Sequence, residues 1–113
     1  MDREDHLDVF FYKETSGREP VREWLRSLDK AAKKTIGEDI KTVQFGWPLG
    51  MPLVGNLGGG LWEVRSHLEN TIARVIFVVA RDQMILLHGF IKKTRATPKT
   101  ELDLARKRAA KVL

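Results

Sequence analysis

The stretch Leu61–Lys93 reads LWEVRSHLENTIARVIFVVARDQMILLHGFIKK and decides the fold. It contains three apolar segments, at 61–65, 71–79 and 84–93, that are rich in β-branched and aromatic residues. The breaks between them are short, and adjacent antiparallel strands need only a hairpin to connect them. The pattern therefore predicts three neighbouring strands of an antiparallel sheet.

The N-terminal half predicts one strand followed by two helices. Residues 7–12 read LDVFFY, with apolar residues at alternate positions, and we expect them to form an edge strand of the same sheet. Apolar residues recur at helical spacing over 20–28 and again over 29–45, so both segments are predicted to be helices. Residues 46–60 hold six of the nine glycines and are predicted to form a loop.

A last helix is predicted after the sheet, because Thr97-Pro98 places a capping residue before a proline at the first helical position. The element order is then β-α-α-β-β-β-α. This order predicts an α+β fold with a mostly antiparallel sheet and the helices packed on one side of it.

Length and composition favour one intracellular domain. Residues 1–113, of which 42% are hydrophobic, are enough to form a single domain with one core. The chain has no cysteine, which excludes disulfides and thiolate metal sites and favours the cytoplasm. The N-terminal residues are acidic and do not resemble a signal peptide. His6, His67 and His88 are far apart in sequence, so we expect neither a metal site nor another cofactor.

Positive charge is concentrated in the second half of the chain. Residues 58–113 hold eleven Lys and Arg against five Asp and Glu, within a total net charge of +5. Four cations and no acid lie between His88 and Lys99, and such a field suits a polyanion such as RNA. These cations are Lys92, Lys93, Arg95 and Lys99. The alternative is a solvated basic face that serves solubility.

Arginines and lysines on the strands are the candidates for chemistry. RNA cleavage through its own 2′-hydroxyl needs a base, an acid and cations that stabilise charge on the phosphate oxygens. Arg65, Arg74, Lys92 and Lys93 can supply these roles if the sheet brings them together. Arg74 shares a strand face with aliphatic neighbours, so it must either form an ion pair or face an anionic ligand. A catalytic Arg74 predicts that alanine at this position abolishes cleavage and leaves the fold intact.

Two further residues have alternative roles. His88, predicted to share a strand face with Leu86 and Phe90, is either a hydrogen-bonded core histidine or an acid/base group. Glu63 shares a face with Arg65 and is expected to be its ion-pair partner, with a carboxylate base as the alternative. A buried pair between Glu63 and Arg74 would make Arg74 a determinant of stability.

Several motifs of this chain resemble the phage Gp49-like, HigB branch of the RelE/ParE toxin superfamily. They are Leu61–Arg65, Arg74–Phe77 and Leu87–Thr94, followed by Pro98 and Glu101. The resemblance covers nearly the whole chain and implies the small RelE-like fold. It also implies a toxin of a type II toxin–antitoxin pair that cleaves mRNA in the ribosomal A site, without a metal.

The resemblance also assigns residues and partners. Arg74 matches the strand arginine of the family, Lys93 matches the basic residue that closes the last strand, and Arg65 and Lys92 are weaker matches. The chain departs from some RelE enzymes, because it lacks a C-terminal tyrosine and has Glu63 where they have a lysine. We expect Arg95 and Lys99 to contact RNA or the ribosome.

The expected partners are the ribosome, mRNA and an antitoxin, expected to be a small helix-turn-helix protein, with no membrane. The alternatives are a ParE-like gyrase inhibitor and a non-catalytic RNA-binding module.

Overall fold

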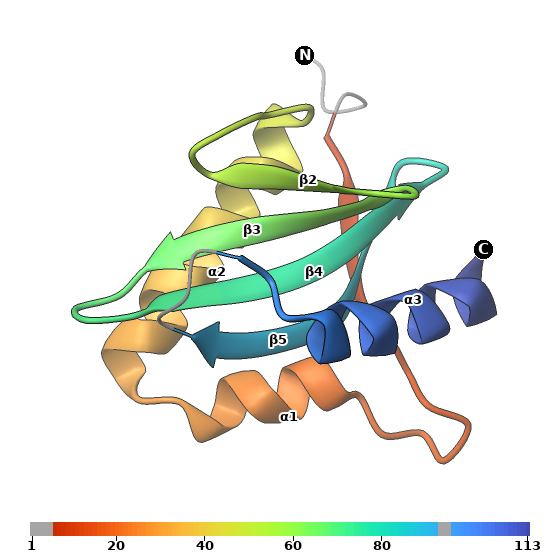
Figure 1. The fold of residues 1–113 in the computed structure, drawn as a ribbon, viewed down its shortest axis with the longest axis horizontal. Coiled ribbons are helices and arrows are strands. Elements are labelled where there is room, and N and C mark those ends of the chain that lie inside the picture. Colours follow the sequence, from red (N-terminus) through yellow and green to blue (C-terminus); the bar gives the residue numbers. More distant parts are fainter. Residues whose placement is uncertain (1–5, 93–95) are drawn as a thin grey trace.

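The computed structural model describes residues 6–92 and 96–113, which form five strands and three helices (Figure 1). In chain order these are β1 (Asp8–Phe11), α1 (Pro20–Ser27), α2 (Lys30–Gly46), β2 (Val54–Gly58), β3 (Leu61–His67), β4 (Ile72–Ala80), β5 (Gln83–Lys92) and α3 (Lys99–Val112). The strands form one sheet in the order β1-β5-β4-β3-β2. β2 to β5 are an antiparallel meander, and β1 pairs in parallel with β5 at one edge. The predicted α+β class and the predicted edge strand are confirmed.

β2 lies inside the segment 46–60, where a loop was predicted, so that prediction is wrong in part. Val54 pairs with Val64 of β3 and is buried, because the strand completes the sheet over the core. Gly58, Gly59 and Gly60 all have positive φ, at 86°, 63° and 85°, and make the tight connection into β3. Glycine-rich composition thus concealed a short strand, and the element order is β-α-α-β-β-β-β-α.

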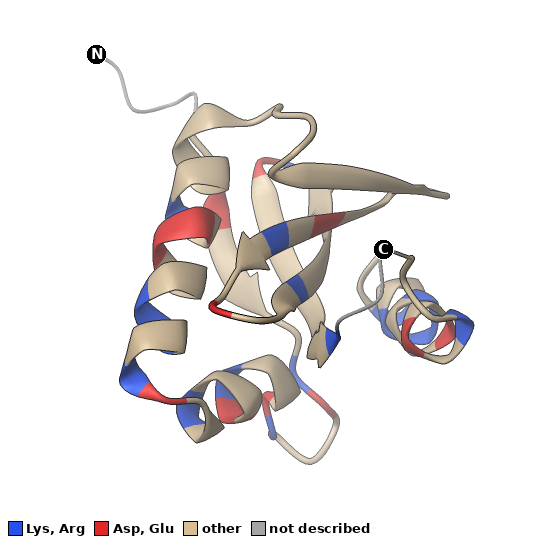
Figure 2. Cartoon of the chain, turned by 60° about the vertical axis from the view of Figure 1, so that its left-hand side comes forward, with Lys and Arg blue, Asp and Glu red and all other residues tan. Residues whose placement is uncertain are grey.

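The helices lie on both faces of the sheet, so the prediction that they pack on one side is wrong (Figures 1 and 2). α1 and α2 cover one face, where Ile36 and Val43 pack against Val75 and Phe77. α3 covers the other face, where Ala105 is part of a second core with further sheet residues. The burial pattern of β4 agrees with helices on both faces. Consecutive residues of this strand are buried, which is typical of a strand whose two faces are both covered.

A bulge in β5 decides which side chains point toward α3. Ile76 pairs with His88, whereas Phe77 pairs with Leu86, so β5 has one extra residue at this point. Leu86 belongs to the core under α1 and α2, and Phe90 belongs to the core under α3. His88 therefore shares a face with Phe90 but not with Leu86. The predicted grouping with Leu86 is wrong, because the bulge shifts the two-residue alternation by one.

Gly89 lets α1 approach β5 closely. A Cβ atom at this position would overlap the ring of Trp24, which extends from α1 onto the sheet. The glycine of the His-Gly-Phe segment is therefore required for helix packing, and it holds the strand that carries His88 against α1.

Candidate functional site

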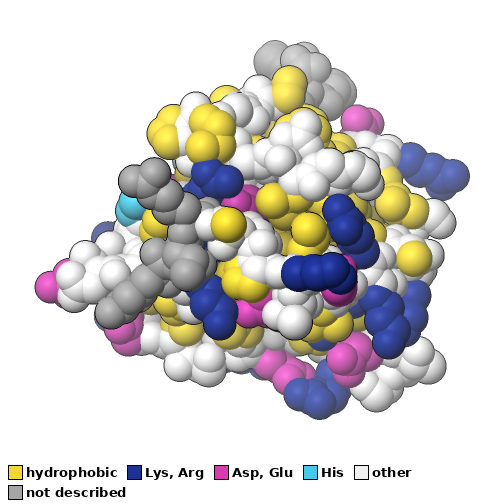
Figure 3. Space-filling model, viewed as in Figure 1, with side chains coloured by type: hydrophobic (Ala, Val, Ile, Leu, Met, Phe, Trp, Pro, Cys, Tyr) yellow, Lys and Arg dark blue, Asp and Glu magenta, His cyan; other side chains and the backbone are white. Residues whose placement is uncertain are grey.

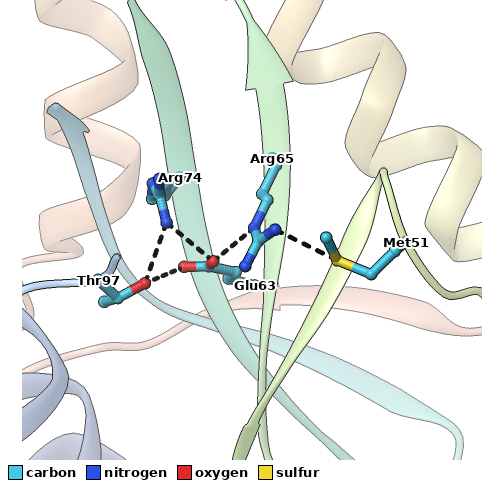
Figure 4. Close-up of polar contacts among 5 residues, drawn as sticks. All are labelled: Met51, Glu63, Arg65, Arg74 and Thr97. Carbon is cyan, nitrogen blue, oxygen red and sulfur yellow. Dashed lines mark hydrogen bonds and ion pairs between the residues drawn. The ribbon is translucent and has the colours of Figure 1, made fainter. Parts of the chain in front are cut away.

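The carboxylate of Glu63, on β3, is the centre of a buried polar network (Figure 4). Its Oε2 accepts hydrogen bonds from Arg65 Nε at 2.7 Å and from Arg74 Nη1 at 3.1 Å. Its Oε1 accepts a hydrogen bond from the Thr97 hydroxyl at 2.6 Å, and that hydroxyl also accepts one from Arg74 at 3.2 Å. The network joins β3 and β4 to the chain just before α3. The predicted ion pair between Glu63 and Arg65 is confirmed.

The strand register explains why a carboxylate is needed here. Arg65 and Arg74 lie directly opposite each other on β3 and β4, and like charges in such a cross-strand pair repel. Glu63 lies two residues before Arg65 and so points to the same face. One carboxylate between two guanidinium groups leaves an excess of one positive charge within this network.

Arg74 is 1% exposed, and its partner Glu63 is 0% exposed. A guanidinium this deeply buried contacts protein groups and is not accessible to solvent. This environment favours the structural alternative for Arg74, in which the arginine stabilises the sheet and fixes Glu63.

Arg65 is the more exposed of the two arginines in the network, with 24% of its side chain accessible. Its Nη1 donates to the Met51 sulfur at 3.2 Å, and its guanidinium lies against Gly55 of β2. A Cβ atom at Gly55 would be 2.8 Å from Arg65 Nη2, so a larger residue would require the end of this arginine side chain to shift. Nothing in the sequence pattern assigned a role to Met51 or Gly55. Thr97 was predicted to cap α3, and that prediction is wrong, because Pro98 is the N-cap, no side chain caps the helix and the Thr97 hydroxyl donates to Glu63 instead. A glycine inside a strand is the one signal that indicates such a close approach.

A second polar group lies on the same face, at the boundary between β5 and α3. His88 Nε2 is 2.6 Å from Glu101 Oε1, and Lys92 Nζ is 4.0 Å from Glu101 Oε2. The imidazole stacks on the ring of Phe90, with 5.5 Å between ring centroids. Both members of the His88–Glu101 pair are partly accessible, and Lys92 is exposed. His88 is therefore a hydrogen-bonded imidazole that Glu101 orients, with 16% of its side chain accessible.

The sheet brings the two groups next to each other. Arg74 pairs with Phe90 across β4 and β5, and His88 and Lys92 lie two residues on either side of Phe90 on the same face. Lys99 lies apart from these contacts, because its Nζ pairs with Asp103 at 2.7 Å along α3. Lys93 and Arg95 are outside the residues that the structure describes. The face that bears α3 displays Lys and Arg side chains around that helix (Figure 3).

The groups suit acid/base chemistry on an anion. His88, oriented by Glu101, can accept or donate a proton, and Lys92 and Arg65 can stabilise negative charge. Within residues 6–92 and 96–113 no three His, Asp or Glu side chains gather in a way that could hold a metal ion. In the same ranges no helix is long and apolar enough to cross a membrane.

These features define a small α+β protein with a five-stranded, mostly antiparallel sheet, an element order close to that of RelE-like proteins, and a cationic face. Comparison with known families matches residues 23–110 to the family described as Phage derived protein Gp49-like (DUF891). The chain therefore belongs to the Gp49-like family, which is a family of RelE-like toxins. This membership is consistent with a toxin of a toxin–antitoxin system and implies an antitoxin partner. The search of curated proteins found no significant match.

Proposed function

We propose that this protein is a ribosome-dependent mRNA endoribonuclease of a type II toxin–antitoxin system. The observation that carries the proposal is the His88–Glu101 pair beside Lys92, on the sheet face that also holds Arg65. An oriented imidazole flanked by accessible cations is what cleavage of RNA through its 2′-hydroxyl requires.

In the proposed reaction the 2′-oxygen attacks the adjacent phosphorus, and the bond from phosphorus to the 5′-oxygen breaks. A neutral His88 takes the 2′-hydroxyl proton, the Lys92 ammonium gives a proton to the departing 5′-oxygen, and a 2′,3′-cyclic phosphate remains. Arg65 and Lys92 stabilise charge on the non-bridging oxygens. Glu63 is not assigned as the base, because its two oxygens already accept three hydrogen bonds.

Dependence on the ribosome follows from the small number of groups in the site. Few side chains are available to align the 2′-oxygen, the phosphorus and the leaving oxygen, and alignment accounts for a large part of such a rate enhancement. A ribosome that holds mRNA in a fixed conformation would supply this alignment. Lys93 stays a proposed catalytic cation, and Arg95 and Lys99 are proposed to contribute to RNA or ribosome binding.

The test is to map 5′ ends produced by the purified protein on an mRNA, with and without programmed ribosomes. We expect cleavage with ribosomes and little without them, and equal cutting of naked RNA would refute the ribosome-dependent mechanism. His88→Gln should lower cleavage about a hundredfold or more, and the matched control His67→Gln should cleave like the wild type. A fully active His88→Gln variant would remove His88 from the mechanism.

Induced expression without an antitoxin should block protein synthesis before DNA synthesis. Pulse labelling of both in the same culture separates this outcome from gyrase inhibition, which would stop DNA synthesis first. Growth arrest without any new mRNA ends would favour the RNA-binding alternative.

A further inference from the structure

α3 is divided into a half with paired charges and a half with unpaired cations. In its first turns Lys99 pairs with Asp103, and Glu101 pairs with His88 and Lys92. In its last turns the cations are Arg106, Lys107, Arg108 and Lys111, and no acid follows Asp103. Within residues 6–92 and 96–113 none of these four cations forms an ion pair. The unpaired half lies outside the candidate site.

Three of these cations line a cavity of about 360 Å³ between α3 and the segment that follows β1. Its walls include Lys107, Arg108 and Lys111 on the helix side and Tyr12, Thr15 and Ser16 on the other. Glu14 also lines the cavity, so its lining charges sum to an excess of two positive charges. Hydroxyl and ammonium groups that converge on one hollow suit an anion with several oxygen atoms.

Arg108 is fixed in this cavity before any ligand binds. Its Nη1 donates a hydrogen bond to the carbonyl oxygen of Leu87 at 2.8 Å, and its guanidinium lies over the Tyr12 ring, 5.4 Å from the centroid. A guanidinium has five N–H donors, and only one of them is used in these contacts. Little side-chain entropy remains to be lost when the other donors bind an anion.

The position of Arg108 connects the cavity to the candidate site. Leu87, whose carbonyl it binds, directly precedes His88 on β5, and Glu101 is seven residues earlier on α3, which is about 10 Å along a helix. An RNA strand that placed one phosphate beside His88 could therefore place another, a few nucleotides away, beside Arg108.

We infer that Lys107, Arg108 and Lys111 form a second binding site for the phosphodiester backbone of RNA, separate from the site of cleavage. The inference rests on the proposed function for the identity of the polyanion. Cations near a helix C-terminus also stabilise the helix dipole, and that role alone would affect folding and not RNA affinity. The two roles are separable by experiment.

The test compares two variants with the same loss of charge. Lys107→Gln/Lys111→Gln removes two cations of the cavity, and Lys33→Gln/Lys34→Gln removes two exposed cations of α2, on the other face of the sheet. The probe is a fluorescent 2′-O-methyl RNA oligonucleotide, which lacks the attacking hydroxyl, and its binding is followed by anisotropy from low to high salt. We expect the cavity variant to bind about tenfold more weakly at 0.1 M salt, with a salt slope lowered by about 1.4.

The control double variant should bind the oligonucleotide nearly as well as the wild type, and Lys107→Arg/Lys111→Arg should restore wild-type binding. Equal losses in the two Gln variants would show a net-charge effect and overturn the inference, as would binding that is unchanged both to the oligonucleotide and to ribosomes. A second assay measures how much of each variant sediments together with programmed ribosomes. A defect in both assays identifies mRNA as the source of the phosphate, and a defect confined to ribosomes identifies ribosomal RNA.

These assays distinguish failure of the proposed nuclease from failure of the second binding site. The oligonucleotide assay does not depend on cleavage, so normal oligonucleotide binding by a wild-type protein that cleaves no mRNA refutes the proposed nuclease and leaves the second site standing. Active cleavage with identical RNA binding by all variants refutes the second site alone. Thermal melting of each variant identifies any loss of binding that is caused by unfolding.

Discussion

Replacing Arg74 with alanine should destabilise the protein, because it removes one member of a buried ion pair. Arg74 and Glu63 are 1% and 0% exposed, and the loss of one partner in such a pair costs about 3–5 kcal/mol of unfolding free energy. Glu63 keeps its hydrogen bonds from Arg65 and Thr97, which places the expected loss near 3 kcal/mol. For a chain of this length that corresponds to a decrease in Tm of about 13 °C.

The assay is urea and thermal unfolding followed by circular dichroism, with mRNA cleavage measured on the same preparations below the melting range. Arg65→Ala is the matched control, since it removes an arginine from the same carboxylate at a 24% exposed position and should cost about 1 kcal/mol. Adding Glu63→Gln to Arg74→Met should recover part of the stability that Arg74→Met alone loses, because it removes the buried Glu63 charge, which would otherwise keep only the partly exposed Arg65 as its ion-pair partner.

An Arg74→Ala variant that unfolds within about 1 kcal/mol of the wild type would refute this reasoning, since ion-pair loss at buried sites is larger. If that variant had also lost cleavage, Arg74 would be catalytic, as the family resemblance implies. If it melted early but cleaved normally when folded, Arg74 would act through stability alone.

Substitutions at three positions test the geometry of the helices, all by thermal melting. Gly89→Ala should destabilise by about 1–3 kcal/mol, because its Cβ would overlap Trp24, and a wild-type Tm would show that α1 moves away freely. Gly37→Ala, in α2 with no atom within 4 Å of the added Cβ, should stabilise by about 0.5–1 kcal/mol, and a lower Tm would contradict the helix geometry. Asp29→Ala should cost about 1 kcal/mol, whereas Asp29→Asn should cost little, because the Asp29 carboxylate caps α2 by accepting from Ala32 N at 2.8 Å.

Local sequence patterns predicted the elements that depend on short-range periodicity. Alternating and β-branched residues indicated β3, β4 and β5, and helical spacing indicated α1 and α2. Thr97-Pro98 indicated the start of α3 to within one residue, although Pro98 and not Thr97 is its N-cap. The pairing of Glu63 with Arg65 was also predictable, because residues two apart on a strand share a face. Each of these predictions needs only the neighbours of a residue in the chain.

The glycine-rich composition of residues 46–60 predicted a loop and missed β2, because that strand forms by pairing with β3. Val54 and Gly55 are buried by pairing with β3 and by packing on the core, and neither effect is visible in a glycine-rich segment read alone. The side on which α3 packs is likewise a property of the whole sheet, since a helix with an apolar stripe can cover either face.

The candidate site was determined by tertiary structure for the same reason. The bulge in β5 turned His88 toward α3, and only the docking of that helix brought Glu101 to 2.6 Å from the imidazole. The sequence showed that Arg74 needed either a carboxylate partner or an anionic ligand, but it did not determine which of the two. The answer depended on the packing of α3 and Thr97 over β4. There Thr97 contacts Arg74, although the two residues are 23 positions apart in the chain. Side-chain identity thus determined which groups were available, and long-range packing determined which of them became buried and which stayed accessible to a ligand.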